Sequence, residues 1–191
     1  MALALEFPEI RFHLTDIESE TTPNYQNARG LAERWGLENV TFGVRDILEP
    51  EPDRYDLVTS VEVLEHIEDD ARAVESMRAA ANKYVFVLVS FADQKTNADE
   101  NLSRKALRSH EHCRVGYEAD RLQSLLPDVV AMRGCYWRER GGKLRERLKG
   151  LQDEEISASL TELGAEARND IVEAVPSVYP EAQGIWALSR V

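Results

Sequence analysis

Four histidines are the side chains of this sequence that can exchange a proton near neutral pH, and they lie at His13, His66, His110 and His112. His13 alternates with apolar residues in a strand pattern, so we expect it to be structural. His66 either lines a ligand pocket or caps the helix that follows it. We predict His112 as the first candidate for an acid–base or substrate-contacting residue, and Tyr117 as the second.

The segment around residue 111 also carries a pattern that metal sites use. His110 and His112 flank Glu111, and in an extended segment the two imidazoles would share a face. A zinc site needs three or four protein ligands, and the sequence places no third ligand here. We therefore predict a solvated loop at this point and no metal.

Two aspartates stand at the ends of predicted strands, which is where open parallel sheets bind their ligands. Asp16 follows the apolar alternation of residues 10–14, and Asp46 follows the strand pattern of residues 39–44. A carboxylate at such an edge can accept hydrogen bonds from a bound ligand, and Asp16 is the first candidate for this contact. The competing interpretation of Asp16 is an aspartate that closes a turn or caps a helix.

Strands and helices alternate along the sequence, which favours an α/β fold with a mainly parallel sheet. The run YVFVLVS at residues 84–90 is apolar almost throughout and indicates a strand that is buried on both faces. The polar stretch 93–113 shows no pattern that places regular structure. The predicted strands span residues 10–16, 39–44, 55–61, 84–90, 129–137 and 184–191, and the predicted helices span residues 22–36, 69–82, 117–126 and 153–174.

Composition excludes several classes of protein. The 191 residues suit one domain, and 43% hydrophobic and 30% charged residues are typical of a globular chain. The net charge of −12 argues against a nucleic-acid partner, because neutralising phosphates requires excess Lys and Arg. The two cysteines exclude a disulfide scaffold. The sequence shows neither a membrane span nor a secretory signal, so we expect a soluble cytoplasmic protein.

Four motifs together resemble a known family. They are HLTD at residues 13–16, VRDI at 44–47, YDLVTSVEVLEHI at 55–67 and HCRVGY at 112–117. This combination resembles the class I S-adenosylmethionine-dependent methyltransferases of the small-molecule type, and the segment with Leu-Glu-His is its most specific part. The resemblance covers roughly residues 1–135.

The resemblance implies a Rossmann-like α/β sheet with helices on both faces, and methyl transfer from S-adenosylmethionine to a small molecule. Asp16 would bind the ribose hydroxyls and Asp46 the adenine amino group. The remaining positions it implies are Ile17 and Ile47 around the adenine ring, Ser60 and Val61 at the methionine end, and His66, His112 and Tyr117 at the acceptor.

One part of the family pattern has no counterpart in this sequence. The family places a central strand and a Gly-rich turn before the strand at 10–16, in the sheet order 3-2-1-4-5-7-6. Here residues 1–7 match the tail of the helix that follows this turn, and the first of the ten glycines is Gly30. We weigh three hypotheses: a truncated methyltransferase, a chain completed by a partner or a second copy, and a non-catalytic protein that binds and stabilises a partner enzyme.

Two further segments extend the minimal pattern. Residues 133–149 carry seven basic and two acidic side chains, which fits an anionic ligand or, more simply, an exposed helix face. The helix at 153–174 presents one apolar stripe that must be covered. We predict a single domain over residues 1–191 that is incomplete at its N-terminus, with a helical insertion at 138–183.

Overall fold

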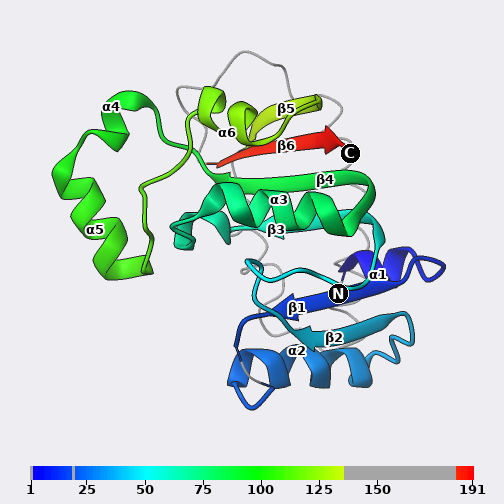
Figure 1. Cartoon of the computed structure of the whole chain (residues 1–191). Helices are drawn as coiled ribbons and strands as arrows, with labels where there is room; N and C mark the ends of the chain where they lie inside the picture. The colour runs from blue at the N-terminus through cyan, green and yellow to red at the C-terminus, as the bar shows by residue number, and fades with distance from the viewer. Residues whose placement is uncertain (1, 19, 136–183) are drawn as a thin grey trace. The chain divides into compact units, whose positions relative to one another are not determined.

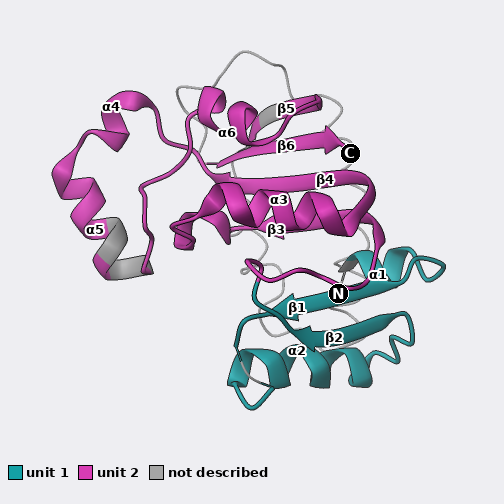
Figure 2. Cartoon of the chain, viewed as in Figure 1, with its two compact units in different colours: residues 1–46, 143–174 teal, residues 47–142, 175–191 magenta. Residues whose placement is uncertain are grey.

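The computed structural model describes residues 2–18, 20–135 and 184–191 (Figure 1). The chain divides into two compact units (Figure 2). Of the described residues, unit 1 holds 2–46 and unit 2 holds the remainder. The sequence predicts one domain with a helical insertion, and the insertion lies outside the described residues. Each unit is therefore described by itself.

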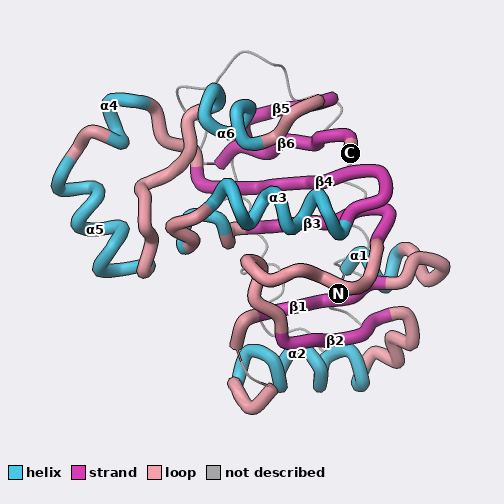
Figure 3. The backbone as a smooth tube through the Cα atoms, viewed as in Figure 1, coloured by secondary structure: helices cyan, strands magenta, loops and turns pink. Residues whose placement is uncertain are grey.

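Unit 1 contains two parallel strands joined by a helix, with a short helix before them (Figure 3). Strands β1 and β2 pair from Phe12 opposite Val40 to Asp16 opposite Val44. Tyr25 is buried and lies against the ring of Phe42, with 5.9 Å between the ring centroids. The elements are α1 (Ala2–Glu6), β1 (Phe12–Asp16), α2 (Pro23–Arg34) and β2 (Val40–Val44).

Asn39 explains why β1 begins at residue 12 and not at residue 10 as predicted. Its side-chain amide donates to the carbonyl oxygens of Ala4, Phe7 and Ile10, at 3.0, 3.2 and 3.0 Å. The backbone at Ile10 is thus held in a turn, and its N–H donates to Phe7 at 3.1 Å. The strand starts only where the N–H of Phe12 donates to the carbonyl of Asn39, at 2.8 Å.

Unit 2 is built on a four-stranded sheet in the order β3-β4-β6-β5. Strand β4 is parallel to β3, and β6 runs antiparallel to both β4 and β5. The strands are β3 (Tyr55–Val61), β4 (Ala81–Ser90), β5 (Val129–Cys135) and β6 (Gly184–Arg190). The helices are η1 (Leu64–His66), α3 (Asp70–Ala80), α4 (Gln94–Asn97), α5 (Glu100–His110) and α6 (Ala119–Leu125).

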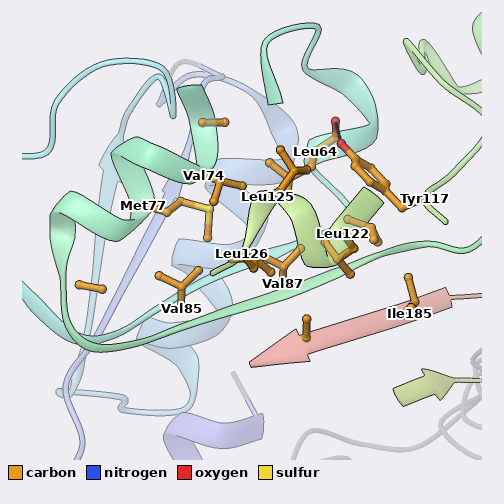
Figure 4. Close-up of a cluster of buried hydrophobic side chains, with 14 residues drawn as sticks. Leu64, Val74, Met77, Val85, Val87, Tyr117, Leu122, Leu125, Leu126 and Ile185 are labelled. Atoms are coloured by element: carbon orange, nitrogen blue, oxygen red, sulfur yellow. Dashed lines mark hydrogen bonds between the residues drawn. The ribbon is translucent and has the colours of Figure 1, made fainter. Parts of the chain in front are cut away.

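The core of unit 2 lies between its sheet and the helices α3 and α6 (Figure 4). Alternate residues of β4 point into it, and Val85, Val87 and Val89 are all 0% exposed. This alternation places their neighbours on the opposite face, where Phe86 lies 5.8 Å from Trp186 between ring centroids. Full burial of a valine stabilises the fold by about 1.5–3 kcal/mol, so β4 anchors the residues at its carboxyl end.

The sheet topology agrees with the resemblance. The family order without its central strand leaves two groups of neighbours, which in the present labels are β2-β1 and β3-β4-β6-β5. The structure has these two sheets. Among the described residues, β1 pairs only with β2, and β3 pairs only with β4. The strand orders of the two described sheets therefore agree with the predicted Rossmann-like methyltransferase fold.

The polar stretch at 93–113, where the sequence pattern placed no regular structure, contains the two helices α4 and α5. Asp93 caps α4 by accepting from the N–H of Thr96 at 2.7 Å. Hydrogen bonds from the side chain and from the backbone N–H of Thr96 lower the pKa of Asp93. Asp99 likewise accepts from the N–H groups of Asn101 and Leu102 at the start of α5. No helix in the described part of the chain is long and apolar enough to cross a membrane.

Other element ends differ by a few residues. Helix α3 ends at Ala80 and β4 begins at Ala81, so the predicted helix to residue 82 and strand from residue 84 are corrected. Helix α6 begins at Ala119, because Tyr117 forms a parallel bridge with Phe91 instead of a helical turn. The predicted helix at 153–174 lies outside the described residues.

Candidate functional site

The two predicted aspartates lie at one edge of the sheet in unit 1. Asp16 is the last residue of β1, and its carbonyl accepts from the N–H of Arg45 at 2.8 Å. Asp46 follows directly on Arg45, and both aspartates are exposed. Asp16 also accepts from the N–H of Glu18 at 3.1 Å, so it closes a turn as the competing interpretation expects. Ile17 is 66% exposed beside it.

The other predicted cofactor residues belong to unit 2. Ser60 is 3% exposed, whereas Val61, the last residue of β3, is 51% exposed. Ile47 is partly buried and packs against the core of unit 2. The predicted placement of Ile17 and Ile47 around one adenine ring joins residues of the two units, and it remains a prediction.

Glu62 follows β3 and has an unusual backbone conformation. Its φ is 56°, in the left-handed region that residues other than glycine seldom adopt. Its N–H nevertheless continues the ladder and donates to Leu88 of β4 at 2.8 Å. The chain must leave the strand sharply here, because η1 begins two residues later with Leu64, which is 0% exposed. Anchoring on both sides therefore holds Glu62 in this conformation.

Glu62 and Glu65 form a carboxylate pair. Glu65 is 0% exposed, and its Oε1 accepts from the N–H of Ser90 at the end of β4. The Oγ of Ser90 donates to Oε2 of Glu62 at 3.4 Å. Burial first, and then the negative charge of Glu65, raise the pKa of Glu62 from 4.5 to about 8. The surroundings of the pair therefore favour the protonated form of Glu62.

A second buried network fixes the turn that carries the pair. Asp70 is 3% exposed and lies 2.6 Å from Arg121 and 3.6 Å from Arg114. The hydroxyl of Tyr117 accepts from Arg114 at 2.6 Å, and lies 3.1 Å from the carboxylate of Asp70. It also lies 3.0 Å from the carbonyl oxygen of Leu64 (Figure 4). Burial raises the pKa of Tyr117 far above its ordinary value.

Tyr117 therefore has a place that suits a structural role better than the predicted catalytic one. It is 1% exposed, and its hydroxyl is engaged by three residues of the network. A ligand could reach this hydroxyl only by displacing the turn. The sequence offered one signal of this structural role, which is Arg114 three residues earlier. A buried tyrosine needs a hydrogen-bond partner for its hydroxyl, and Arg114 can supply it.

His66 and His112, which were predicted from separate segments, lie in contact. Their ring centroids are 4.5 Å apart with the planes at 82°, an edge-to-face arrangement. Cys113 joins the two segments, because its N–H donates to the backbone carbonyl oxygen of Glu65 at 2.7 Å and its Sγ lies 3.1 Å from the carbonyl oxygen of His66. Both histidines thus lie at η1, the turn that also carries Glu65.

Gly116 allows the segment after His112 to approach β4 closely. A Cβ at this position would lie 2.7 Å from the carbonyl oxygen of Ser90 and 3.0 Å from the N of Ala92. With no side chain there, Tyr117 donates its N–H to Ser90 at 2.8 Å. The glycine therefore lets the backbone at residues 116–117 lie against the end of β4, and a larger residue would separate the two segments.

The condition under which His110 and His112 would share a face, an extended segment, is not met. His110 is the last residue of α5, and Glu111 after it has a φ of 55°, so the segment is not extended. Within the described ranges, no three His, Cys, Asp or Glu side chains are grouped so that they could hold a metal ion. The basic stretch at 133–149 lies outside the described side chains.

Two residues of the site were not predicted from the sequence, Glu62 and Glu65. Both belong to the motif VEVLEH, in which acidic residues three positions apart follow a strand. This spacing was the available signal, since residues at i and i+3 meet when a strand passes into a helical turn. An open hollow on unit 1, lined by Tyr25, Arg29 and Phe42 among others, includes none of the predicted site residues.

Comparison with known proteins supports the family resemblance. Residues 1–84 match the model of a methyltransferase domain family. The curated proteins contain no match to this chain. Among solved structures, the fold is similar to that of the YcgJ protein from Bacillus subtilis, with a TM-score of 0.57 and 18% identity, covering 98% of this chain and 87% of that one.

Two further structures carry methyltransferase names. Coclaurine N-methyltransferase, bound to N-methylheliamine and SAH, has a TM-score of 0.60 and 13% identity, and the similarity covers 97% of this chain and 61% of that one. Phosphoethanolamine N-methyltransferase 2 from Haemonchus contortus, in complex with S-adenosyl-L-methionine, has a TM-score of 0.53 and 13% identity, covering 93% and 42%. At these identities the likeness establishes the fold alone.

Proposed function

We propose that this chain, whose fold is that of the class I S-adenosylmethionine-dependent methyltransferases, binds S-adenosylmethionine and takes part in methylating a small molecule. The observation that carries the proposal is the match of residues 1–84 to a methyltransferase domain, together with the strand order β3-β4-β6-β5. The matched residues include both aspartates and the carboxylate pair.

The residues of unit 1 suit the nucleoside part of this cofactor. Asp16 and Asp46 expose carboxylates at the end of two adjacent parallel strands, where hydroxyl and amino groups can donate to them. We assign Asp16 to the ribose and Asp46 to the adenine amino group. Ile17 supplies exposed apolar surface for the adenine ring. Ile47, which the sequence predicts as the second contact, belongs to unit 2.

The residues of unit 2 suit the reacting end. We assign Val61, which is exposed at the end of β3, and Ser60 before it to the methionine end of the cofactor. His66 and His112 then contact the methyl acceptor, and their ring contact gives the pair one defined arrangement. Tyr117 stabilises η1, which carries His66, through the contact of its hydroxyl with the carbonyl oxygen of Leu64.

S-adenosylmethionine supplies the methyl group on a positively charged sulfur. The chain's own contribution is to hold the acceptor in line with that methyl group and to keep water away. An imidazole at His112 can also hold or accept a proton near neutral pH. We expect His112→Ala to lower turnover while the affinity for the cofactor stays nearly unchanged.

A calorimetric titration of the chain with S-adenosylhomocysteine tests the proposal. We expect micromolar binding, which corresponds to about −8 kcal/mol at 1 μM. Asp16→Ala should weaken binding at least tenfold, because the ribose loses its carboxylate. Asp53→Ala, which removes another exposed aspartate in the loop before β3, is the matched control. No binding by the folded chain would contradict the proposal.

A second function, a non-catalytic protein that binds and stabilises a partner, is favoured by the one-sided pairing of two strands. In the part of the chain that is described, β1 pairs only with β2 and β3 only with β4. Open strand edges of this kind can pair with a strand of another chain. Cofactor binding that occurs only after the partner is added would favour this second function.

A further inference from the structure

The open hollow on unit 1 contains none of the residues that the proposed function uses. It has a volume of about 520 Å³, which lies in the range of about 300–1,000 Å³ that ligand-binding clefts have. Helix α2 lines it with Tyr25 and Arg29 among others, and strand β2 lines it with Val40 and Phe42. The hollow is therefore a groove between a helix and a strand.

Two aromatic rings line the hollow. Tyr25 is 7% exposed and lies against Phe42, with 5.9 Å between the ring centroids. The hydroxyl of Tyr25 forms no hydrogen bond with another residue in the described ranges. Because a tyrosine that is buried to this extent usually has a partner for its hydroxyl, this group is left for a ligand in the hollow.

The charged residues of the hollow leave an excess of negative charge. Nε of Arg29 lies 3.3 Å from Oε1 of Glu33, so these two charges compensate each other. Glu20 and Glu38 also line the hollow and are exposed, and neither forms an ion pair with another described residue. Carboxylates beside aromatic rings suit the side chain of lysine or arginine, whose carbon stem packs on the rings while its charge meets the carboxylates.

The outer edge of β2 borders the same hollow and offers backbone groups for pairing. In a parallel ladder, alternate residues of a strand direct their backbone groups to the same neighbour. The backbone of Asn39 and that of Arg45 both bond to β1, each at 2.8 Å, so the odd-numbered residues of β2 face β1. The even-numbered residues direct their N–H and C=O groups to the outer edge, and they are Val40, Phe42 and Val44.

Strand β2 lacks the features that protect many edge strands from pairing. Charged side chains, prolines and bulges are the common ones. The sequence VTFGV contains neither a charge nor a proline, and its pairing with β1 shows no shift of register. Among the described residues β2 pairs with no strand other than β1. An extended segment can therefore pair with this edge, and alternate side chains of that segment would enter the hollow.

We infer that the hollow and the outer edge of β2 together bind an extended segment of another protein, in which alternate residues are lysine or arginine. The segment adds a strand to β2 through backbone hydrogen bonds. Its basic side chains pack on the two aromatic rings and meet the carboxylates of Glu20 and Glu38. This interaction goes beyond the proposed function, because none of the residues assigned to the cofactor or the acceptor lines the hollow.

Charge and backbone pairing together select this partner over other occupants. An acidic segment would be repelled by Glu20 and Glu38. A small cation could meet the same carboxylates, but it would leave the edge of β2 unpaired. In strand addition the backbone hydrogen bonds give affinity, and the pockets for alternate side chains give specificity. A short free peptide loses conformational freedom when it binds, so we expect a Kd of about 10–100 μM.

The first experiment measures binding to the whole chain by fluorescence polarisation, with a labelled and capped heptapeptide in which valine and lysine alternate. The same peptide with glutamate in place of lysine should bind at least about tenfold more weakly. Added salt should weaken binding of the lysine peptide, because the carboxylates of the hollow are exposed. Cadaverine, a diamine without a peptide backbone, should not displace the lysine peptide at equal concentration.

Variants of the hollow test the same binding. Glu20→Gln combined with Glu38→Gln removes both free carboxylates and should weaken binding about five- to tenfold. Tyr25→Phe keeps the ring and removes only the hydroxyl, and it should weaken binding about threefold. Glu9→Gln changes an exposed glutamate of the same unit outside the hollow, and this control should leave the Kd unchanged. Circular dichroism verifies that each variant is folded.

The second experiment measures hydrogen exchange of the backbone amides by NMR, with and without the lysine peptide. The amides of Val40, Phe42 and Val44 should exchange more slowly in the complex, because they gain partners on the added strand. The amides of Thr41 and Gly43 face β1 and serve as the internal control. A lysine peptide that is N-methylated at alternate backbone nitrogens should bind at least about tenfold more weakly.

Several results would overturn the inference. These are equal affinity for the lysine and glutamate peptides, displacement of the peptide by cadaverine at equal concentration, or unchanged exchange at the outer edge of β2 in the complex. A folded chain that does not bind the lysine peptide would overturn it as well. Binding of S-adenosylhomocysteine is measured separately, and its outcome bears on the proposed function alone.

Discussion

Replacing Glu62 by glutamine should remove a dependence of stability on pH. The raised pKa means that, between pH 4.5 and about 8, the folded chain binds a proton that the unfolded chain has lost. The free energy of unfolding therefore falls as pH rises through this window. At 1.36 kcal/mol per pH unit the full effect would be about 5 kcal/mol. Because the side chain is only half-buried, solvent screening reduces our expectation to about 2 kcal/mol.

Urea denaturation at pH 5, 6.5 and 8.5, followed by circular dichroism, measures this effect. We expect the wild-type chain to lose about 2 kcal/mol more than Glu62→Gln between pH 5 and pH 8.5. The control is Glu68→Gln, which should follow the wild-type curve. If the curves of the wild type and Glu62→Gln are parallel over the whole range, Glu62 carries no extra proton, and the account of the carboxylate pair is refuted.

Two further predictions concern the packing behind the pair. Gly116→Ala would place a Cβ 2.7 Å from the carbonyl oxygen of Ser90. We expect the free energy of unfolding to fall by about 1–3 kcal/mol, measured as a lower midpoint of thermal unfolding. An unchanged midpoint would mean that the segment is not closely packed on β4. Asp70→Asn removes the buried charge that pairs with Arg121 at 2.6 Å, and we expect a loss of about 3 kcal/mol in urea denaturation. A loss below about 0.5 kcal/mol would show that the network behaves like a surface ion pair.

Much of the fold could be predicted from local patterns. The strand at residues 55–61 has the predicted bounds. Helix α2 begins at Pro23 and ends at Arg34, two residues before Gly36, whose φ is 62°. The start of β1 could not be predicted, because Asn39 imposes it from 27 residues away in sequence, counted from Phe12. The helices α4 and α5 were missed because their signals are the capping aspartates Asp93 and Asp99, not an apolar stripe.

The site was predictable in outline but not in its chemistry. Motif spacing led to Asp16, His66 and His112, and the structure places each of them at a strand end or a turn. The roles of Glu62 and Tyr117 depend on burial, which the sequence does not state. Tyr117 is 1% exposed, with its hydroxyl 3.0 Å from the carbonyl oxygen of Leu64. Burial beside Ser90 of β4, and then the charge of Glu65, raise the pKa of Glu62. Both facts arise from packing between segments that are distant in sequence.

Binding of S-adenosylhomocysteine, mapped residue by residue with nitrogen-15 NMR, tests the central claim most directly. We expect the backbone amides of residues 16–18 and 45–47 to shift on titration, and the amides at the ends of β3 and η1 to shift with them. Shifts that cluster instead around Tyr25 and Arg29, at the hollow beside α2, would contradict it. A folded chain with no shifted amides would contradict it as well.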